Sequence, residues 1–413
     1  MNNEKNIEEY MDNLLSRKSI FKNKSALNPD FIPDYLPHRD KEIRELVEII
    51  TPFVLGNKGS NVLLYGKTGT GKTACVRFIL KALSNKAKSH GFNFSFSFSN
   101  CRMDGSEYRV LVSLGSQLGL KLPFTGLATA EVLQRIVSFL QKAEVRCIFV
   151  LDEVDCLIKS SGDDLLYELT RINENLKVPL GIITISNDIS FKEHLDPRVL
   201  SSLSEEELIF KPYTSSQLTD ILQSRSSLAF NEGVLDKGVI PLCAALAASE
   251  HGDARRALSL LRVAGEVAER KGLHIVDEEC VRTAIKRIEE DQSIELIRTL
   301  PLQSKIILLA ILASSKDGTK ATSGEIFSSY KNITSFMGVE ALTYRRFSML
   351  INELEISGLI EGKVISQGRY GRTRFIRVAS PQDLVTRGLS EDLLLHDIMD
   401  KLSLLNLPLE SNL

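Results

Sequence analysis

Short apolar runs alternate along the first half of the chain with longer stretches whose apolar residues recur every three or four positions. The runs cover residues 61–65, 92–99, 146–151 and 181–186. Runs that are almost continuously apolar are typical of strands covered on both faces of a sheet. Because strands that alternate with helices form parallel sheets, this half of the chain predicts an α/β fold.

A helix is expected ahead of the first strand. Three prolines between positions 29 and 37 favour an extended segment. From Asp40 onward the apolar residues follow helical spacing, with Asp40 as the expected N-cap. Residues 1–25 are polar and are expected to be frayed, although helical spacing of Ile7, Met11 and Leu14 would allow them to dock.

The strand pattern fades after Pro212, and residues 214–290 have the pattern of amphipathic helices rich in Ala, Leu, Arg and Glu. A third region begins near Leu300. It predicts three helices followed by two β-like runs, over residues 306–312, 324–330, 342–356, 362–366 and 373–378. Three helices and a hairpin form the winged-helix plan. The acidic, leucine-rich segment after Pro381 predicts no particular structure.

Composition limits the classes of protein. With 43% hydrophobic and 25% charged residues in 413 positions, the chain has the profile of a soluble protein of roughly two to four domains. A net charge of -2 argues against a non-specific nucleic-acid packager. The cysteines form no Cys-x-x-Cys pair, which disfavours a zinc ribbon or a disulfide framework. Neither a signal peptide nor an apolar stretch of ~18 residues is present, so a cytoplasmic location is expected.

One loop follows the pattern G-x-x-x-x-G-K-[ST] and lies between a predicted strand and a predicted helix. Its glycines allow successive backbone N–H groups to point at phosphate oxygens at the helix N-terminus. We expect Lys72 to bridge the β- and γ-phosphates of ATP and the Thr73 hydroxyl to bind Mg²⁺. The expected nucleotide-binding residues are Gly66, Thr68, Gly69, Thr70, Gly71, Lys72, Thr73 and Ala74.

Two carboxylates end the buried run at 146–151. Open α/β sheets bind ligands at the carboxyl ends of their strands. Asp152 therefore suits the magnesium ion, either as a direct ligand or through a metal-bound water, and Glu153 is placed to polarise the attacking water. An apolar strand that ends in Asp-Glu is by itself also compatible with a solvated turn, but about 80 residues after a P-loop it indicates a Walker B motif.

Two further positions remain open from the pattern alone. Asn187 ends the run at 181–186, where its amide would contact the γ-phosphate or simply lie in a turn. Arg255 and Arg256 begin a helix in the third quarter of the chain. An arginine there would either fold over the nucleotide or lie on a solvated helix face paired with an acid.

The predicted hairpin is locally basic in a chain of net charge -2. Its cations, with no acidic residue between the first and the last, are Lys363, Arg369, Arg372, Arg374 and Arg377. Such a cluster would neutralise DNA phosphates, and a thin glycine-flanked tip would enter a minor groove. The alternative is a solvated hairpin whose basic residues prevent aggregation. Tyr344, Arg345 and Arg346 begin the preceding helix, where a recognition helix meets the major groove.

The order of these motifs resembles that of AAA+ ATPases, and more narrowly of archaeal replication initiators of the origin-recognition and cell-division-control type. The resemblance covers roughly residues 30–380. Its stretches are 35–40, the two Walker motifs, 185–187, 195–202, 211–214, 252–258 and 368–374.

The resemblance implies roles that spacing does not show. Asn187 would be the first sensor and Arg255 the second, and Arg198 would be an arginine finger that acts on a neighbouring subunit. The segment from Tyr35 to Arg39, which includes Leu36, Pro37 and His38, would wrap the adenine, largely by backbone and apolar contact. A helical insertion near residues 105–127 would contact DNA.

We therefore expect a RecA-like AAA+ domain over residues 26–212, a helical lid over 213–296 and a winged helix over 297–385, with a polar segment at 1–25 and a tail at 386–413. The expected function is ATP-controlled initiation at replication origins, with slow hydrolysis as a switch for helicase loading. Expected partners are duplex DNA, paralogous initiator subunits and the replicative helicase, but no membrane. The alternatives are a winged-helix ATPase of transcriptional or signalling control, and a clamp-loader or transposition-type ATPase.

Overall fold

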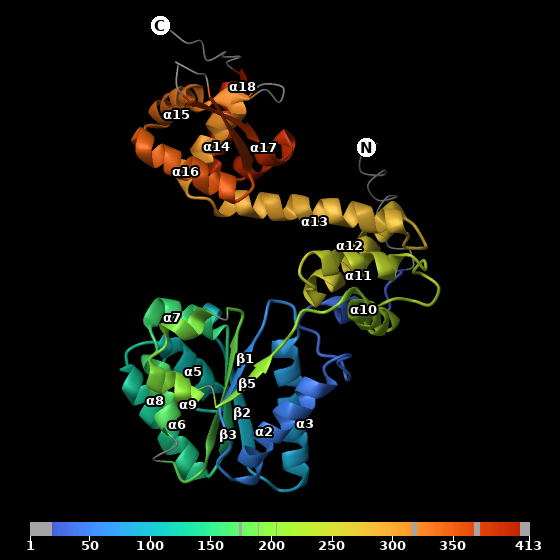
Figure 1. The fold of residues 1–413 in the computed structure, drawn as a ribbon, viewed down its shortest axis with the longest axis vertical. Helices are drawn as coiled ribbons and strands as arrows, with labels where there is room; N and C mark the ends of the chain where they lie inside the picture. Colours follow the sequence, from blue (N-terminus) through green and yellow to red (C-terminus); the bar gives the residue numbers. More distant parts are fainter. Residues whose placement is uncertain are drawn as a thin grey trace, which may run out of the picture. The chain divides into compact units, whose positions relative to one another are not determined.

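The computed structural model describes residues 19–172, 176–188, 190–203, 205–315, 320–366 and 372–404. The chain divides into two compact units, whose boundary between Ala284 and Ile285 falls within helix α13 (Glu278–Thr299) (Figure 1). Among the described residues, no helix combines the length and apolar character that crossing a membrane requires.

The first unit is built on a parallel sheet in the order β2-β3-β4-β1-β5. Its strands are β1 (Val62–Tyr65), β2 (Phe94–Asn100), β3 (Arg146–Asp152), β4 (Leu180–Ser186) and β5 (Glu206–Ile209). The predicted α/β class and the four predicted strands are confirmed, within a residue or two at each end. The edge strand β5 was not predicted, because glutamates fill its first half and only Leu208 is buried.

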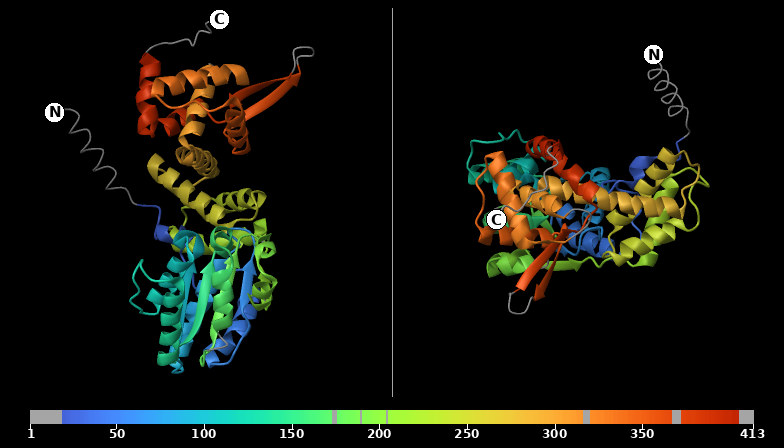
Figure 2. Two further views of the ribbon diagram at one scale, coloured as in Figure 1. Left: turned by 90° about the vertical axis from the view of Figure 1, so that its left-hand side faces the viewer. Right: turned by 90° about the horizontal axis from the view of Figure 1, so that it is seen from above.

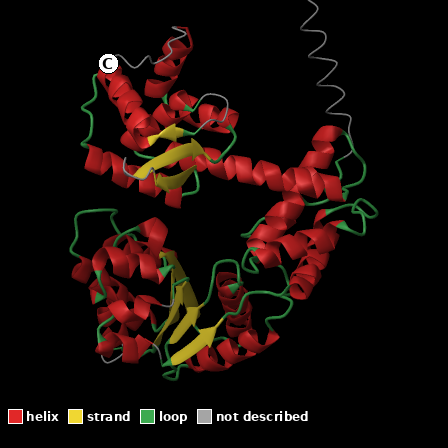
Figure 3. Ribbon diagram, turned by 45° about the horizontal axis from the view of Figure 1, so that its top comes forward, coloured by secondary structure: helices red, strands yellow, loops and turns green. Residues whose placement is uncertain are grey.

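Helices cover both faces of this sheet (Figure 3). On one face, α2 (Asp40–Leu55) and α3 (Lys72–Ser89) contribute Leu46, Ile50, Val76 and Ile79 to one apolar core. The helices whose side chains form the core of the other face are α5 (Glu107–Gln117), α6 (Thr129–Ala143), α7 (Val154–Ser161), α8 (Asp164–Ile172) and α9 (Pro197–Leu203). The expected Asp40 cap is wrong, because Asp40 is the first helical residue and Arg39 occupies the N-cap position.

Three further helices of the first unit form a layer after the sheet: α10 (Ser215–Ala229), α11 (Val239–Ser249) and α12 (Ala254–Lys271). Figure 2 shows them packed side by side. The short helix η1 (Lys24–Leu27) packs against α10 and α12, and the ring of Phe21 stacks on Phe230 at 4.7 Å. The expected fraying is therefore wrong for residues 19–25, while residues 1–18 lie outside the described part.

The second unit has the predicted winged-helix plan. Its elements are α14 (Leu302–Ser314), β6 (Ala321–Thr322), α15 (Ser323–Met337), α16 (Tyr344–Ile356), β7 (Ile360–Ser366) and β8 (Arg372–Val378), followed by α17 (Gln382–Ser390) and α18 (Leu393–Leu404). The strands form an antiparallel sheet in the order β6-β8-β7. The segment after Pro381, which the pattern left unassigned, forms α17 and α18, whose residues Leu389 and Leu395 lie in the core.

Candidate functional site

A cavity of about 480 Å³ opens at the carboxyl edge of the sheet in the first unit. Its walls come from the loop before α3, the ends of β3 and β4, the segment 29–37 and the helices α10 and α12. The residues at one end are Gly69, Gly71, Lys72, Thr73, Ala74, Asp152, Glu153, Asn187 and Arg255. Side chains that are far apart in the sequence therefore surround one space.

The P-loop needs glycine at two positions, because of their backbone angles and because a side chain would collide with neighbouring atoms. Gly69 and Gly71 have φ angles of +70° and +88°, which side chains with a Cβ rarely adopt. A Cβ at Gly69 would lie 1.6 Å from Asp253 Oδ1, and one at Gly71 would lie 2.8 Å from Tyr213 Oη. The loop ends at the first turn of α3, which contains no acidic residue, so its N–H groups are available to an anion.

Lys72 is held in place by oxygen atoms. Its Nζ donates to Gly66 O at 2.7 Å, to Lys67 O at 2.8 Å and to Asn187 Oδ1 at 2.8 Å. Burial lowers the pKa of Lys72 to about 8, against the opposing charge of Asp152. The ammonium group therefore lies, poorly hydrated, between the P-loop and the end of β4.

Thr73 and Asp152 form a second polar pair. The hydroxyl of Thr73 donates to Asp152 Oδ2 at 2.9 Å. Burial raises the pKa of Asp152, while the hydrogen bond from Thr73 opposes that shift. A hydroxyl beside a buried carboxylate supplies the hard oxygen ligands that Mg²⁺ prefers.

Glu153 has a strained backbone. Its φ of 53° and ψ of 43° lie in the left-handed region, and it is the N-cap residue of α7. A non-glycine residue in this region costs free energy, and such residues cluster at functional sites. The turn directs Glu153 into the cavity beside Asp152.

Asp155 was not predicted, although it positions the end of β4. This buried carboxylate accepts from Ser186 Oγ at 3.0 Å and from Asn187 N at 3.4 Å. The sequence signal that could have identified Asp155 is an acidic residue in the first turn of the helix that follows the Walker B strand. Asn187 is thus fixed by Asp155 on its backbone and reaches Lys72 with its amide oxygen.

Arg255 enters the cavity from the N-terminus of α12. Asp253 caps this helix by accepting from Arg255 N at 2.7 Å and from Arg256 N at 3.3 Å. The side chain of Arg255 lines the cavity, whereas Arg256 pairs with Glu250. Of the two arrangements left open by the sequence, Arg255 adopts the one over the cavity and Arg256 the paired one.

Part of the segment expected around adenine lines the cavity. Tyr35, Leu36 and Pro37 do so. His38 turns away, and its Nε2 lies 2.7 Å from Asp220 on α10. Arg39 is buried beneath the P-loop and donates to Thr70 O. The side chains of His38 and Arg39 are therefore held by polar partners and do not line the cavity, and the adenine wall stays a prediction for the backbone and apolar contacts of this segment.

Arg225 is a further arginine of the cavity, and the sequence pattern did not single it out. Arg225 on α10 is buried and lines the cavity. It donates to Phe31 O at 2.9 Å and to Asn28 O at 3.0 Å, and burial lowers its pKa to about 10. Arg225 thereby ties the segment before α2 to the lid helices.

Arg198 lies at the start of α9 and outside this cavity. Its side chain is 70% exposed and pairs with Asp196 at 3.1 Å. The insertion near residues 105–127 contains α5, and its most exposed large apolar side chain is Phe124, at 86%. Neither Arg198 nor any residue of the insertion lines the cavity of its own chain.

The candidate DNA-binding residues fall into two groups. Arg345 and Arg346 are exposed in the first turn of α16, which Thr343 caps, and the half-exposed ring of Tyr344 packs on Phe347. Arg374 instead donates to Asn352 at 2.6 Å and pairs with Glu355, both on α16.

DNA binding by the basic wing stays a prediction, but α16 holds the Arg374 guanidinium, which the sequence pattern did not predict. Arg377 is likewise paired, with Glu361. Arg369 and the side chain of Arg372 lie outside the described residues.

Three family models match the chain in succession. An AAA domain matches residues 57–187, a Cdc6 AAA+ ATPase-type lid domain matches residues 219–286, and a CDC6 C-terminal winged helix domain matches residues 295–388. Together they cover the sheet, the lid helices and most of the second unit.

Relatives resemble the chain over nearly its whole length. An ORC1-type DNA replication protein 1 of Sulfolobus acidocaldarius is 46% identical over 387 residues, 93% of this chain and 97% of the relative. An ORC1-type DNA replication protein of Pyrococcus horikoshii is 48% identical over 378 residues, 90% of each chain. The solved structure of the Aeropyrum pernix ORC1 protein in complex with DNA has a TM-score of 0.80 at 47% identity, covering 92% of this chain and 99% of that one. With its P-loop, lid arginine and winged helix in this order, the chain belongs to the family of ORC1-type DNA replication proteins, which are AAA+ ATPases.

Proposed function

We propose that this chain initiates DNA replication by binding duplex DNA at origins under the control of ATP. The observation that carries the proposal is the single cavity in which Lys72 and Glu153 meet Arg255 from the lid. Relatives that share 46% to 48% of its residues are named DNA replication proteins, and the similar Aeropyrum pernix protein was solved with DNA.

The residues of the cavity fit ATP and one magnesium ion. The P-loop amides and Lys72 would hold the β- and γ-phosphates, and Thr73 with Asp152 would hold the metal. When bound, Mg²⁺ neutralises phosphate charge and polarises the γ-phosphate. Apolar side chains at the other end, among them Phe31 and Leu36, would take the base.

Hydrolysis would use Glu153 as the group that accepts a proton from the attacking water. Asn187, fixed by Asp155, would orient that water or the γ-phosphate. Arg255 would contact the γ-phosphate only while it is present, which links ATP to the closed lid. We propose that turnover is slow and separates two assembly states rather than driving a motor. In that assembly Arg198, which is exposed, would act on the nucleotide of a paralogous neighbouring subunit.

DNA binding would begin with α16. Its exposed N-terminal turn offers Arg345 and Arg346 to the major groove or to phosphates. The wing and the insertion near residues 105–127 would add contacts. DNA held in this way would be the platform for loading the replicative helicase.

Genome-wide occupancy of the tagged protein tests this function. An initiator should occupy a few sites beside the start of replication, and a variant with Arg345→Ala and Arg346→Ala should lose them. Occupancy at many promoters, with no enrichment beside the replication start, would instead support transcriptional control. Rapid DNA-stimulated ATP turnover by a stable ring would support a clamp-loader or transposition-type ATPase.

A further inference from the structure

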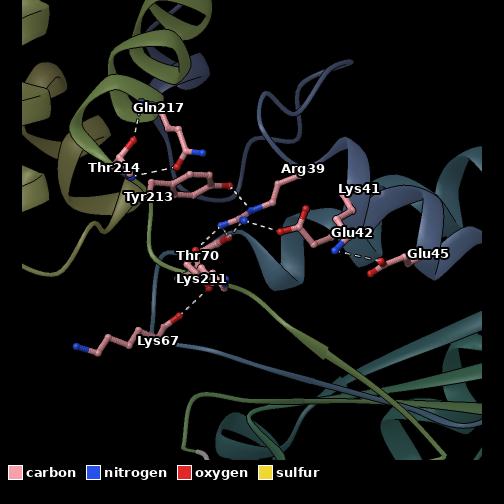
Figure 4. A network of polar contacts seen from close by, with 10 residues as sticks. All are labelled: Arg39, Lys41, Glu42, Glu45, Lys67, Thr70, Lys211, Tyr213, Thr214 and Gln217. Carbon is pink, nitrogen blue, oxygen red and sulfur yellow. Dashed lines mark hydrogen bonds and ion pairs between the residues drawn. The ribbon is translucent and has the colours of Figure 1, made fainter.

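Arg39 lies beneath the P-loop with only 4% of its surface exposed. Figure 4 shows its guanidinium between three parts of the first unit. Nε and Nη2 donate to Thr70 O at 3.1 and 2.8 Å, and Nη1 donates to Glu42 at 2.7 Å. One side chain thus fixes the carbonyl in the middle of the phosphate-binding loop.

The same guanidinium also holds the linker between the sheet and the lid. Nη2 donates to Lys211 O at 2.7 Å, and Nε donates to Tyr213 Oη at 2.9 Å (Figure 4). Its carbon lies 4.1 Å from the centre of the Tyr213 ring. The linker joins β5 to α10, whose N-terminus Thr214 closes with a capping box. A movement of α10 relative to the P-loop would therefore have to break or bend these bonds.

Tyr213 extends the connection to the helix that carries Arg255. Its backbone N donates to Gly252 O at 3.2 Å, one residue before the Asp253 cap of α12. Ala254 N in turn donates to Gly69 O at 3.1 Å. The contacts close a ring from the P-loop through Arg39, Tyr213 and the start of α12 back to the P-loop.

The chemistry of the two side chains suits a fixed joint. Burial raises the pKa of Tyr213 to about 12, so its hydroxyl stays protonated at neutral pH. The planar guanidinium of Arg39 serves several acceptors at once. A lysine presents a single nitrogen and is unable to hold Thr70, Lys211 and Tyr213 in the same way.

We propose that Arg39 is a positioning residue that transmits the nucleotide state of the P-loop to the lid, and so sets how strongly Arg255 distinguishes ATP from ADP. The proposal rests on the proposed function, in which Arg255 senses the γ-phosphate. Arg39 itself does not line the cavity. The competing role is purely structural: Arg39 would stabilise the fold without affecting which nucleotide is preferred.

Dissociation constants for ATP and ADP, each with Mg²⁺, distinguish these roles in the full chain. The variants are Arg39→Gln, Arg255→Ala and the double variant. Lys41→Ala is the matched control, because Lys41 lies two positions further along on α2 with its side chain 83% exposed and pairs only with Glu45 among the bonds drawn (Figure 4).

The wild type should prefer ATP by roughly fivefold or more, the range of typical coupling, and Arg255→Ala should remove that preference. Arg39→Gln should remove most of the preference for ATP over ADP. The double variant should lose no more of this preference than Arg255→Ala alone. Lys41→Ala should keep the wild-type ratio. An unchanged ratio in folded Arg39→Gln protein, or losses that multiply in the double variant, would overturn the proposal.

Other outcomes separate this proposal from the function on which it rests. If Arg255→Ala keeps the preference while Arg39→Gln loses it, the sensor role of Arg255 is wrong. A wild type without any ATP preference would leave Arg39 nothing to transmit and would overturn the proposal too. If Arg39→Gln does not fold, Tyr213→Phe replaces it, because it removes only the hydroxyl. Tyr213→Phe should lose part of the preference for ATP. An unchanged ratio of the ATP and ADP dissociation constants in Tyr213→Phe would exclude transmission from Arg39 through the Tyr213 hydroxyl.

Discussion

The hydroxyl of Thr73 donates to the carboxylate of Asp152 across 2.9 Å, although the two residues lie on different elements and 79 positions apart. The parallel sheet brings them together, because β1 leads into the P-loop while β3 ends at Asp152 in the same sheet. The pair places two oxygen ligands at the point where the phosphates would meet α3. If nucleotide binding depends on magnesium as proposed, this arrangement makes that dependence a direct consequence of the fold.

Thr73→Val should remove that dependence. The substitution keeps the shape of the side chain but deletes the metal-binding hydroxyl. We expect ATP to bind the wild type at least about tenfold more tightly with Mg²⁺ than with a chelator, a difference of about 1.4 kcal/mol. In Thr73→Val the two affinities should approach each other. Titration of a fluorescent ATP analogue measures both, and an undiminished Mg²⁺ effect in the variant would rule out Thr73 as a ligand.

Nucleotide affinity without metal should fall as the pH rises above about 8. Burial lowers the pKa of Lys72 to about 8, whereas phosphates favour its charged form. Binding above pH 8 must therefore take up a proton, and affinity should fall by about tenfold per pH unit. Calorimetry of ADP binding in two buffers of different ionisation enthalpy counts that proton. Proton uptake on ADP binding should be near zero at pH 7. Its absence at pH 9 would contradict the role of Lys72 as the group that takes up the proton.

Gly69→Ala should weaken nucleotide binding because its Cβ would collide with the Asp253 cap of the lid helix. Gly119→Ala is the matched control, since Gly119 has a φ of +90° and open space around it. Both variants should lose about 1 to 2 kcal/mol of stability from backbone strain. Thermal unfolding and nucleotide titration separate the effects. Equal affinities in the two variants would show that contact between lid and P-loop is dispensable.

Arg345→Ala with Arg346→Ala should weaken binding to duplex DNA and flatten its salt dependence. Each lost phosphate contact reduces the slope of log affinity against log salt by about 0.9. Arg374→Ala should act differently, because α16 holds that side chain through Asn352 and Glu355. It should lower the unfolding temperature and leave most of the slope intact. A larger slope change in Arg374→Ala than in the Arg345 and Arg346 variant would reverse these roles.

The parts of the site that sequence predicts are those encoded locally. The P-loop, the Walker B strand and the helix start at Arg255 each combine a short pattern with its neighbouring element. The order of strands then follows the rules of parallel sheets, so the common edge could be expected as well. That edge is where Lys72, Asp152 and Asn187 meet.

The contacts that the sequence pattern did not predict involve partners far away in the sequence. Arg39 is directed by Tyr213 and Thr70, and Arg225 by Asn28 and Phe31. No local period reports such contacts. The edge strand β5 was not predicted because only one of its residues is buried. The pairing of Arg374 was not predicted because a run of basic residues has the same sequence pattern whether its side chains are free or paired with acids.

The central claim is that Lys72 binds the nucleotide and Glu153 drives its hydrolysis in the cavity that Arg255 closes. Single-turnover hydrolysis of bound ATP tests it most directly, with nucleotide affinity measured on the same samples. Lys72→Ala should abolish binding. Glu153→Gln should bind ATP within about threefold of the wild type, less than 1 kcal/mol, and hydrolyse it at least about 100-fold more slowly. Wild-type hydrolysis in both variants would contradict the account.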